Sequence, residues 1–320
     1  MSTDLDVVTL GEAMLMLVAG ETGPLEDVQT FHKRTAGAET NVAIGLARLG
    51  LKVGWASRLG SDSMARYLLG EMQREGVDCS QVVCEPGQRT GFQFKGRVDD
   101  GSDPPVEYHR RGSAASRMGA AHLDDAWLRR ARHLHVTGVF PALAEGTQAA
   151  TRKAIAAMRG AGRTVSFDPN LRPTLWASPE LMRATLNDLA RQCDWILPGI
   201  EEGRFLTGHA EPERIAAFYR ARGARLVVVK LGADGAYFDG EAGSGHIPAC
   251  RVERVVDTVG AGDGFAVGVI SALLEGRPVA DAVRRGAWIG ARAVQVRGDT
   301  EGLPTRGQLE TAGIESPARG

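Results

Sequence analysis

The sequence lacks the features that would place the protein in a membrane, outside the cell or on nucleic acid. No stretch of its 320 residues approaches the ~18 uninterrupted apolar positions of a membrane-spanning helix. Residues 1–6 carry acids instead of the basic start of a leader peptide. The formal net charge is −1 at pH 7, which argues against a nucleic-acid surface. We therefore expect a cytoplasmic protein that contacts neither membrane nor nucleic acid.

Cysteine is scarce as well, and the cysteines and histidines show no metal-binding spacing. The four cysteines, which form no C-x-x-C pair, are Cys79, Cys84, Cys193 and Cys250. We expect reduced thiols that mostly serve packing, and a bridge between Cys79 and Cys84 stays open as the alternative. His133 and His135 alternate along an expected strand, so a structural role is favoured over metal binding.

Glycine, in contrast, is plentiful, and one glycine-rich stretch at 255–266 carries the main functional signal. A short β-branched run is followed by three glycines and by an apolar segment, 265–274, which predicts a strand, a tight turn and a helix. Glycines let a ligand approach the backbone, and the first N–H groups of a helix have no internal partner, so the turn is suited to phosphate. Asp263, placed among these donors, indicates a base beside a phosphoryl site.

Two other glycine-rich motifs do not match this turn. The dinucleotide motif G-x-G-x-x-G needs a third glycine where Phe265 stands. The P-loop motif needs a lysine after a glycine, and none of the five lysines follows one. A plain helix cap is the structural alternative, although a cap needs one glycine rather than a cluster.

Residues 257–263, with the sequence D-T-V-G-A-G-D, resemble the D-T-x-G-A-G-D signature of the ribokinase-like (phosphofructokinase-B type) sugar kinases. The resemblance implies that Gly260, Ala261 and Gly262 form the hole for the transferred phosphoryl group, and that Asp263 takes the proton of the sugar hydroxyl. It also implies ATP and Mg²⁺ as cofactors and allows a monovalent cation. We expect the helix amino terminus to keep Asp263 ionised.

The order of the expected elements indicates an α/β fold with a mostly parallel central sheet and helices on both faces. The expected strands are 6–10, 14–18, 52–57, 133–137, 164–168, 195–197 and 225–230, and the expected helices are 42–49, 62–75, 147–159, 179–191 and 265–274. Residues 90–98 and 106–111 alternate at period two around a turn and predict a hairpin. The resemblance makes this hairpin part of a small β lid over the sugar. The predicted core is 1–13, 37–88 and 114–320, and the predicted lid is 14–36 and 89–113.

Further motifs narrow the substrate. Residues 36–43 resemble the family's G-G-A-x-x-N-x-A substrate motif, which assigns Gly37 and Asn41 to the sugar. Residues 108–114 and 167–172 look like those of 2-keto-3-deoxygluconate kinases. Arg110 and Arg172 would grip a sugar-acid carboxylate, with Tyr108 beside them, whereas a neutral sugar needs no such pair.

The remaining assignments concern the nucleotide and the departures from the family pattern. Residues 230–236 resemble the K-x-G-x-x-G segment, which assigns Lys230, Gly232 and Gly235, together with Gly260 and Gly262, to the nucleotide. Gly199 replaces the asparagine of an N-x-x-E motif that keeps Glu202, so Glu202 receives an indirect role in organising Mg²⁺.

Gln93 stands where sugar-acid kinases often have tyrosine, and this departure leaves the substrate open. A fructokinase, a ribokinase, a 5-keto-2-deoxygluconate kinase and a non-catalytic sugar-binding regulator remain the alternatives. Because an exposed lid sheet tends to pair with a second one, we expect a homo-oligomer, a dimer through the lid.

Overall fold

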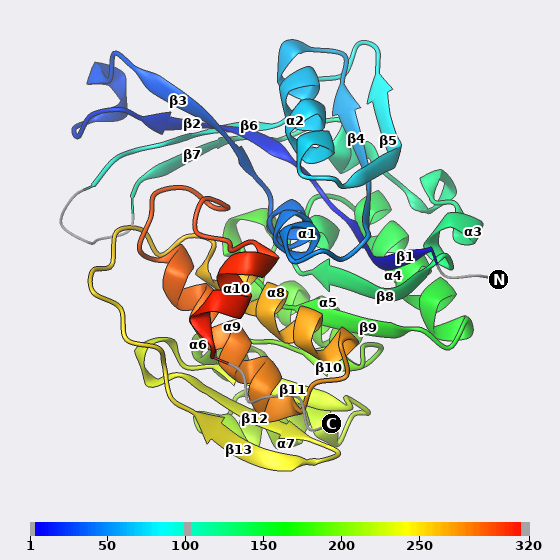
Figure 1. Ribbon diagram of the computed structural model, residues 1–320. Coiled ribbons are helices and arrows are strands. Elements are labelled where there is room, and N and C mark those ends of the chain that lie inside the picture. The colour runs from blue at the N-terminus through cyan, green and yellow to red at the C-terminus, as the bar shows by residue number, and fades with distance from the viewer. Residues whose placement is uncertain (1–3, 99–103, 315–320) are drawn as a thin grey trace.

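The structure, a computed structural model, describes residues 4–98 and 104–314, whose strands form a sheet of nine strands and a sheet of four (Figure 1). The strands of the large sheet are β1 (Leu5–Leu10), β4 (Val53–Gly60), β5 (Asp78–Glu85), β8 (Ala131–Thr137), β9 (Thr164–Asp168), β10 (Trp195–Ile196), β11 (Leu226–Lys230), β12 (Ala236–Gly240) and β13 (Gly243–Ile247). Their order is β13-β12-β11-β10-β9-β8-β1-β4-β5.

The large sheet is mostly parallel, as the sequence predicts. The pairings that link β5 through to β11 are parallel, and β12 and β13 run antiparallel at one edge. Val227, Val228 and Val229 of β11 are fully buried. A strand covered on both faces consists of such a continuous apolar run, and this pattern made the strand recognisable.

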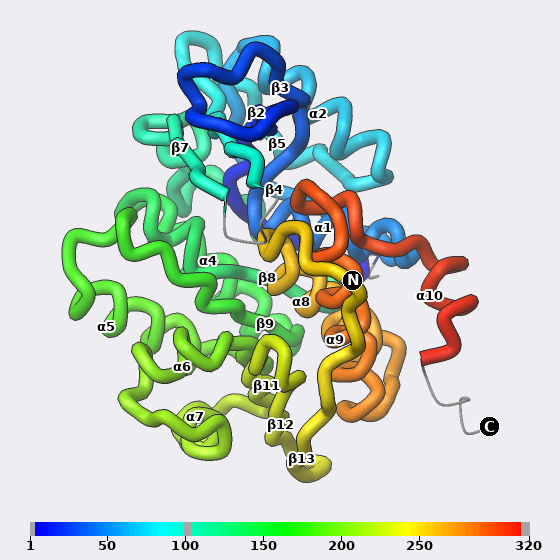
Figure 2. The backbone as a smooth tube through the Cα atoms, turned by 90° about the vertical axis from the view of Figure 1, so that its left-hand side faces the viewer, coloured from blue at the N-terminus to red at the C-terminus, as the bar shows by residue number. Residues whose placement is uncertain are grey.

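Helices cover both faces of this sheet, each over its own apolar core. The helices of one face are α1 (Ala38–Arg48), α2 (Ser63–Arg74), α8 (Ala261–Leu274), α9 (Val279–Ala293) and α10 (Arg306–Ala312), and those of the other are α3 (Asp125–Leu128), α4 (Glu145–Gly160), α5 (Pro179–Ala190), α6 (Ile200–Thr207) and α7 (Pro212–Arg220). Short 3-10 turns lie at Leu25–Asp27, Ala115–Arg117, Ala120–His122, Phe140–Ala142, Pro173–Leu175 and Gly232–Asp234. Figure 2 shows α4 to α7 on one side of the strands and α8 to α10 on the other. The predicted fold class is confirmed.

The small sheet stands off the main sheet, with the order β3-β2-β6-β7 (Figure 1). Its strands are β2 (Met14–Ala19), β3 (Phe31–Ala36), β6 (Phe92–Lys95) and β7 (Val106–His109), and all four fall within the segments predicted as the lid. The hairpin of β6 and β7 is confirmed, although part of its turn lies outside the described residues. Gln93 and Lys95 are buried on one face of β6, while Phe92 and Phe94 point to the other.

The strand predicted directly before the glycine turn is not formed. The N–H groups of Val256 and Asp257 donate instead to the Val294 carbonyl oxygen, at 2.7 and 3.2 Å, where α9 ends. The segment lies against a helix end rather than a sheet edge, so its β-branched residues have no strand to pair with. The helix after the turn is present as predicted and stops before Gly276.

The cysteines and the paired histidines have structural roles. All four cysteines are free, so the bridge between Cys79 and Cys84 is absent. Both ring nitrogens of His133 lie 2.8 Å from a hydroxyl, those of Thr164 and Ser166, and His135 Nδ1 lies 2.8 Å from Ser166 Oγ. These buried histidines serve the sheet. No helix in the described part of the chain combines the length and apolarity that crossing a membrane demands.

Candidate active site

A cavity of about 990 Å³ lies between the lid and the carboxyl ends of the parallel strands. The lid, the start of α1, the ends of β9 and β11, and the start of α8 all contribute to its wall. Ligands of open parallel sheets bind at this edge, because strand ends and helix starts meet there. All the residues predicted for substrate, nucleotide and phosphoryl group line it: Gly37, Asn41, Tyr108, Arg110, Arg172, Lys230, Gly232, Gly235, Gly260, Ala261, Gly262 and Asp263, as does Glu202.

The amino end of α8 forms an anion site opposite a lysine. Gly260 caps the helix with a φ of 83°, and a Cβ there would lie 2.6 Å from the Asp299 carbonyl oxygen, so the position requires glycine. A Cβ on Gly262 would have Lys230 Nζ, at 3.5 Å, as its nearest neighbour outside its own turn. Helix N–H groups and an ammonium therefore border the same space, which suits a phosphate.

Lys230 is held in place by a second carboxylate at the strand ends. Its Nζ donates to Asp168 Oδ2 at 2.6 Å. Burial disfavours the charge on Lys230, but Asp168 and Glu202 outweigh it and raise the lysine pKa. Burial also raises the pKa of Asp168 to about 6, with Lys230 opposing this shift. At neutral pH the two form an ion pair, with the ammonium turned toward the anion site.

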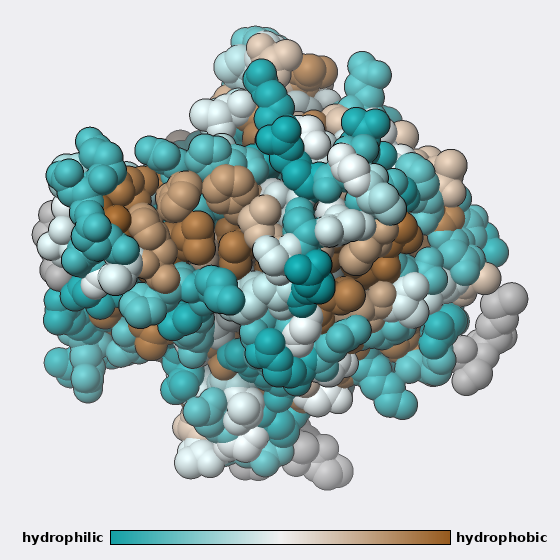
Figure 3. All heavy atoms as spheres, turned by 90° about the horizontal axis from the view of Figure 1, so that it is seen from above, coloured by the Kyte–Doolittle hydropathy of each residue, from teal (hydrophilic) through white to brown (hydrophobic). Residues whose placement is uncertain are grey.

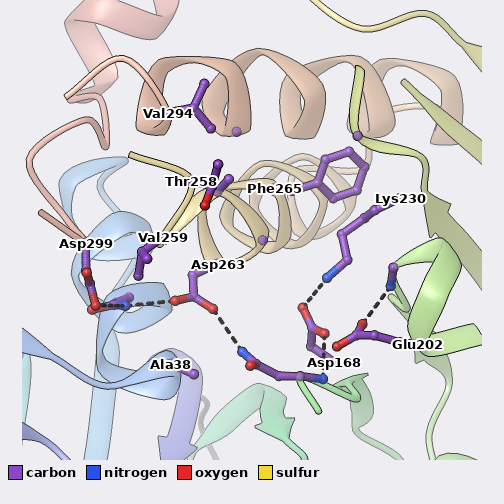
Figure 4. Close-up of a pocket in the computed structure, with 18 of the residues that line it drawn as sticks. Ala38, Asp168, Glu202, Lys230, Thr258, Val259, Asp263, Phe265, Val294 and Asp299 are labelled. Atoms are coloured by element: carbon purple, nitrogen blue, oxygen red, sulfur yellow. Dashed lines mark hydrogen bonds and ion pairs between the residues drawn. The ribbon is translucent and has the colours of Figure 1, made fainter. Parts of the chain in front are cut away.

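Asp263 lies in the centre of the cavity wall (Figure 4). Asn41 Nδ2 donates to its Oδ2 at 2.7 Å, and Asn170 Nδ2 approaches its Oδ1 at 3.5 Å. Asn170 adopts a φ of 39°, and its N–H donates to Asp168 Oδ1 at 3.2 Å. Asparagine adopts a positive φ more readily than most other residues, and this backbone conformation places its amide beside Asp263.

The expected low pKa of Asp263 is wrong. Burial raises the pKa of Asp263 to about 8, and the carboxylates of Asp168 and Asp299 add to this, while the Asn41 hydrogen bond and Arg172 work against it. Desolvation thus outweighs the helix dipole that the sequence emphasises. A carboxylate with a pKa near the working pH is a better base than an ordinary one.

The two predicted arginines differ in their surroundings. Arg110 is bound to Glu12, with Nε and Nη2 at 2.7 and 2.6 Å from Glu12 Oε2, and both side chains are buried. Ser113 Oγ also donates to Glu12. Arg172 Nη1 donates to the Leu171 carbonyl oxygen at 2.8 Å. Arg110 therefore has an internal counter-charge, which the sequence analysis missed, while Arg172 donates to a neutral backbone carbonyl.

Tyr108 lies beside Arg110 on the lid. Its side chain is 49% exposed, and its ring centroid lies 5.9 Å from Arg110 Cζ. A ring at this distance attracts the guanidinium through its π face.

Glu202 acts on the backbone around the cavity. Its Oε2 accepts the Gly199 N–H at 2.7 Å, which caps α6, and its Oε1 accepts the Leu171 N–H at 2.9 Å. Over residues 4–98 and 104–314, no group of three or more metal-binding side chains occurs. Mg²⁺ is commonly held by substrate phosphates, water and one or two carboxylates, and the carboxylates that line this cavity fit such binding. Any role of Glu202 toward Mg²⁺ would be indirect.

Three predicted glycines meet different demands. Gly37 has a φ of 144°, and a Cβ would lie 2.4 Å from the Glu12 carbonyl oxygen. Gly235 has a φ of 93°, and a Cβ would lie 2.0 Å from the Ile247 carbonyl oxygen, so glycine is needed for packing of the β12–β13 hairpin. Gly232 has a φ of 62°, and a Cβ there would meet no other atom within 4 Å, so its face stays open to the cavity.

Sequence reasoning missed three acidic residues of the site. Glu12 follows β1 and Asp168 ends β9, so their places at strand ends were available as signals. Asp299 follows α9 in a loop with no recognisable pattern. Its Oδ2 lies 3.4 Å from Asn41 Nδ2, the same amide that binds Asp263.

Comparisons with known proteins agree with this geometry. Over 306 residues, covering 95% of this chain and 94% of the relative, the chain is 51% identical to a 2-dehydro-3-deoxygluconokinase of Bacillus subtilis (strain 168). A PfkB protein from Polaromonas sp. JS666 has a solved structure with a TM-score of 0.89 and 69% identity, covering 96% of this chain and 99% of that one. A putative ribokinase II from E. coli, in complex with ATP and Mg²⁺, has a TM-score of 0.88 and 28% identity, covering 96% and 98%. Residues 4–306 match the pfkB family carbohydrate kinases, and the chain belongs to this family.

Proposed function

We propose that the protein transfers the γ-phosphoryl group of ATP to the primary hydroxyl of 2-keto-3-deoxygluconate, giving 2-keto-3-deoxy-6-phosphogluconate. The observation that carries the reaction type is a buried carboxylate, Asp263, at the start of a helix where a Cβ on Gly262 would lie 3.5 Å from Lys230 Nζ. An anion site and a base at one helix end suit phosphoryl transfer to an alcohol. The relative with the same activity in its name supports the substrate.

The proposed mechanism divides the cavity between the two substrates. The sugar lies under the lid with its hydroxyl at Asp263, which Asn41 and Asn170 orient. The γ-phosphate lies against the N–H groups of 260–263 and Lys230. As the hydroxyl oxygen bonds to phosphorus and the bond to ADP breaks, Asp263 takes the hydroxyl proton. Mg²⁺ bound to the phosphates neutralises part of their charge.

Phosphoryl transfer has a loose transition state in most analyses, so positioning and charge neutralisation contribute more than proton removal. Lys230 is suited to this task because its ion pair with Asp168 keeps it charged and fixed. The backbone donors need no reorganisation, because the helix already orients them.

The sugar acid is proposed from positive charge at the sugar side. Arg172 lines the same cavity as Asp263 and lowers the pKa of that carboxyl group, so its positive charge is placed to attract a carboxylate on a sugar bound there. Arg110 is held by Glu12 through Nε and Nη2. A guanidinium has five N–H donors, so others remain for the substrate. Tyr108 offers an apolar face beside it.

An ADP-release assay over a panel of sugars tests the proposal. We expect the highest kcat/KM with 2-keto-3-deoxygluconate, lower values with 5-keto-2-deoxygluconate, and weak turnover of fructose and ribose. Preference for a neutral sugar would overturn the substrate assignment and leave a sugar kinase of another specificity. Absence of ATP turnover with every sugar would support a sugar-binding regulator instead.

The lid also supports a proposed homodimer. On its outer face the half-buried Leu17 lies next to the half-buried Phe94, and the buried Leu15 lies next to the half-buried Phe92. The Phe31 ring centroid lies 5.2 Å from that of Phe94. In Figure 3, viewed from above, hydrophobic atoms gather on the side where Figure 1 places the lid. Light scattering should give twice the chain mass, and Phe94→Glu should give the monomer.

The use of ATP is in keeping with the cytoplasmic location that we propose.

A further inference from the structure

Lys95 is a buried lysine that the proposed mechanism does not use. It lies on the lid strand β6, and its side chain is 2% exposed. Its Nζ lies 2.5 Å from Asp257 Oδ2 and 3.6 Å from Asp299 Oδ1. Lysine is almost never fully buried unless it is paired, and the two carboxylates are the partners that allow this ammonium to be buried.

Both aspartates border the catalytic turn, Asp257 through its carboxylate and Asp299 through its backbone. Asp257 opens the turn, and its Oδ1 accepts the Val259 N–H at 3.1 Å. Asp299 lies behind it, since its carbonyl oxygen would be 2.6 Å from a Cβ at Gly260. A group that holds Asp257 and Asp299 in position therefore also holds the backbone at the start of α8 in position.

The same pair reaches the base through one amide. Asn41 Nδ2 donates to Asp263 Oδ2 at 2.7 Å and lies 3.4 Å from Asp299 Oδ2. A shift of Asp299 would draw Asn41 away from Asp263. Lys95 is thus linked to the base in three steps, from ammonium to carboxylate to amide to carboxylate.

Two buried carboxylates beside each other need a counter-charge. Burial raises the pKa of Asp299, and Asp257 and Glu301 add to this, while Lys95 opposes it. Without a cation here, ionised Asp257 and Asp299 would repel each other and the turn would loosen. The family resemblance allows a monovalent metal ion as a cofactor, but this pair already has an ammonium at ion-pair distance.

We propose that Lys95 is a tethered monovalent cation, which provides a counter-charge to Asp257 and Asp299, fixes the phosphoryl-binding turn, and makes the kinase independent of free K⁺. The inference rests on the proposed kinase function, because it assigns a positioning residue for that reaction. It also joins the lid to the turn. Gln93, two residues before Lys95 on the same strand face, lines the sugar cavity, so placement of the lid over the sugar and order of the turn depend on one strand.

The test compares cations at equal ionic strength in wild type and Lys95→Met. Wild-type kcat should be the same in potassium, ammonium and tetramethylammonium chloride. In tetramethylammonium the variant should lose about 10–100-fold in kcat, as for removal of an outer supporting group, with a smaller change in KM for ATP. Potassium or ammonium ions should restore much of this loss, because a small cation can enter the space that the ammonium leaves.

Lys33→Met is the matched control, because Lys33 is an exposed lysine on lid strand β3. It should keep wild-type kcat in all three salts. Activation of the wild type by potassium over tetramethylammonium would overturn the proposal, and so would a Lys95→Met variant with wild-type kcat in every salt or with a loss that no cation restores. If Lys95→Met does not fold, Lys95→Gln removes the charge while keeping a hydrogen-bond donor and takes its place.

Thermal unfolding separates this inference from the substrate assignment. Without any substrate, Lys95→Met should gain Tm in potassium relative to tetramethylammonium chloride, and wild type should not. This Tm shift depends on the carboxylate pair alone. It should therefore be seen even if the sugar assignment is wrong or the protein is not a catalyst. The same Tm of the variant in both salts would contradict the inference whatever the sugar panel shows.

Discussion

The phosphoryl side and the sugar side of the cavity are built in different ways. The phosphoryl side comes mainly from one continuous turn, 257–263, whose glycines and helix start provide the donors. The sugar side is assembled from distant segments, with Glu12, Asn41, Arg110 and Arg172 from four separate places in the chain. A contiguous turn carries its chemistry in local backbone geometry, while a dispersed site depends on which side chains the fold brings together.

The two sides differ in charge as well. On the phosphoryl side, burial raises the pKa of Asp263 to about 8, so its charge state is sensitive to what binds there. On the sugar side, Arg110 already has a buried partner in Glu12. We infer that substitutions on the phosphoryl side affect turnover. Substitutions on the sugar side should affect substrate recognition, or stability where they leave a buried charged partner unpaired.

The largest effect is expected from Asp263→Asn. This change should lower kcat by about 10²–10⁴-fold, the range for a general base, because the amide keeps the shape but cannot accept the proton. Binding of ATP, measured by calorimetry, should change little. Wild-type kcat in the variant would remove Asp263 from the chemistry.

Two glycines of the same turn give a second, sharper contrast. Gly262→Val should lower kcat/KM by about 10²–10³-fold, as for a lost oxyanion donor, because the new side chain enters the phosphate space next to Lys230. Its Tm should stay near that of wild type, since no other atom of the fold stands in the way. Gly260→Val should instead lower stability by about 1–3 kcal/mol or more, because φ is 83° and the Asp299 carbonyl is in the way. Equal Tm losses in both variants would contradict the open face of Gly262.

The difference between a contiguous turn and a dispersed site also explains which parts of the fold and of the site could be predicted from the sequence. The turn and its role were predictable because a glycine cluster before an apolar helix has few alternative uses. The parallel strands were predictable from buried apolar runs such as 226–229. The edge strand β5, with half-buried and exposed residues, and the glycine-containing β13 lacked that signal and were not predicted.

Contacts between distant charged residues were not predictable in the same way. Arg110 and Arg172 read alike in the sequence, and only the fold shows that one of them binds Glu12. The charge on Asp263 was misjudged for a similar reason, because burial is a property of the whole fold. Asp299 lies 36 residues after Asp263, in a loop that no periodicity describes.

The arginines therefore supply the third prediction. Arg172→Met should raise KM for 2-keto-3-deoxygluconate, costing about 10–100-fold in kcat/KM through loss of charged hydrogen bonds worth ~1.5–3 kcal/mol. Weak turnover of fructose should stay almost unchanged, and Arg172→Lys should recover part of the loss. An equal loss for both sugars would indicate a structural lesion instead.

Arg110→Met should behave differently, although the same residue type is replaced. It leaves Glu12 as an unpaired buried carboxylate, so stability should fall by about 3–5 kcal/mol and turnover of every sugar should fall with it. Adding Glu12→Gln should restore much of the Tm, because it removes the stranded charge. A Tm loss that Glu12→Gln leaves uncorrected would show that the pair is not the cause.

The last prediction concerns pH, and it tests the raised pKa of Asp263 directly. The base must be ionised, so kcat/KM, which reports the free enzyme, should rise about tenfold per pH unit below a pKa of about 8 and level off above it. Below about pH 6 the profile should steepen, because Asp168 then protonates and releases Lys230. Asp263→Asn should lose the limb near pH 8 while keeping any limb that comes from Asp168 or from ATP.

Stability should follow the opposite sign. Because folding raises the pKa of Asp263, its protonated form is favoured in the folded state, and this contribution to the free energy of unfolding is lost as pH rises from about 4 through about 8. Asparagine does not titrate, so the Tm difference between Asp263→Asn and wild type should grow over that range in favour of the variant. A kcat/KM profile that is flat between pH 7 and 9, together with a constant Tm difference, would mean that Asp263 is ionised well below neutral pH and that the helix end, not burial, controls its charge.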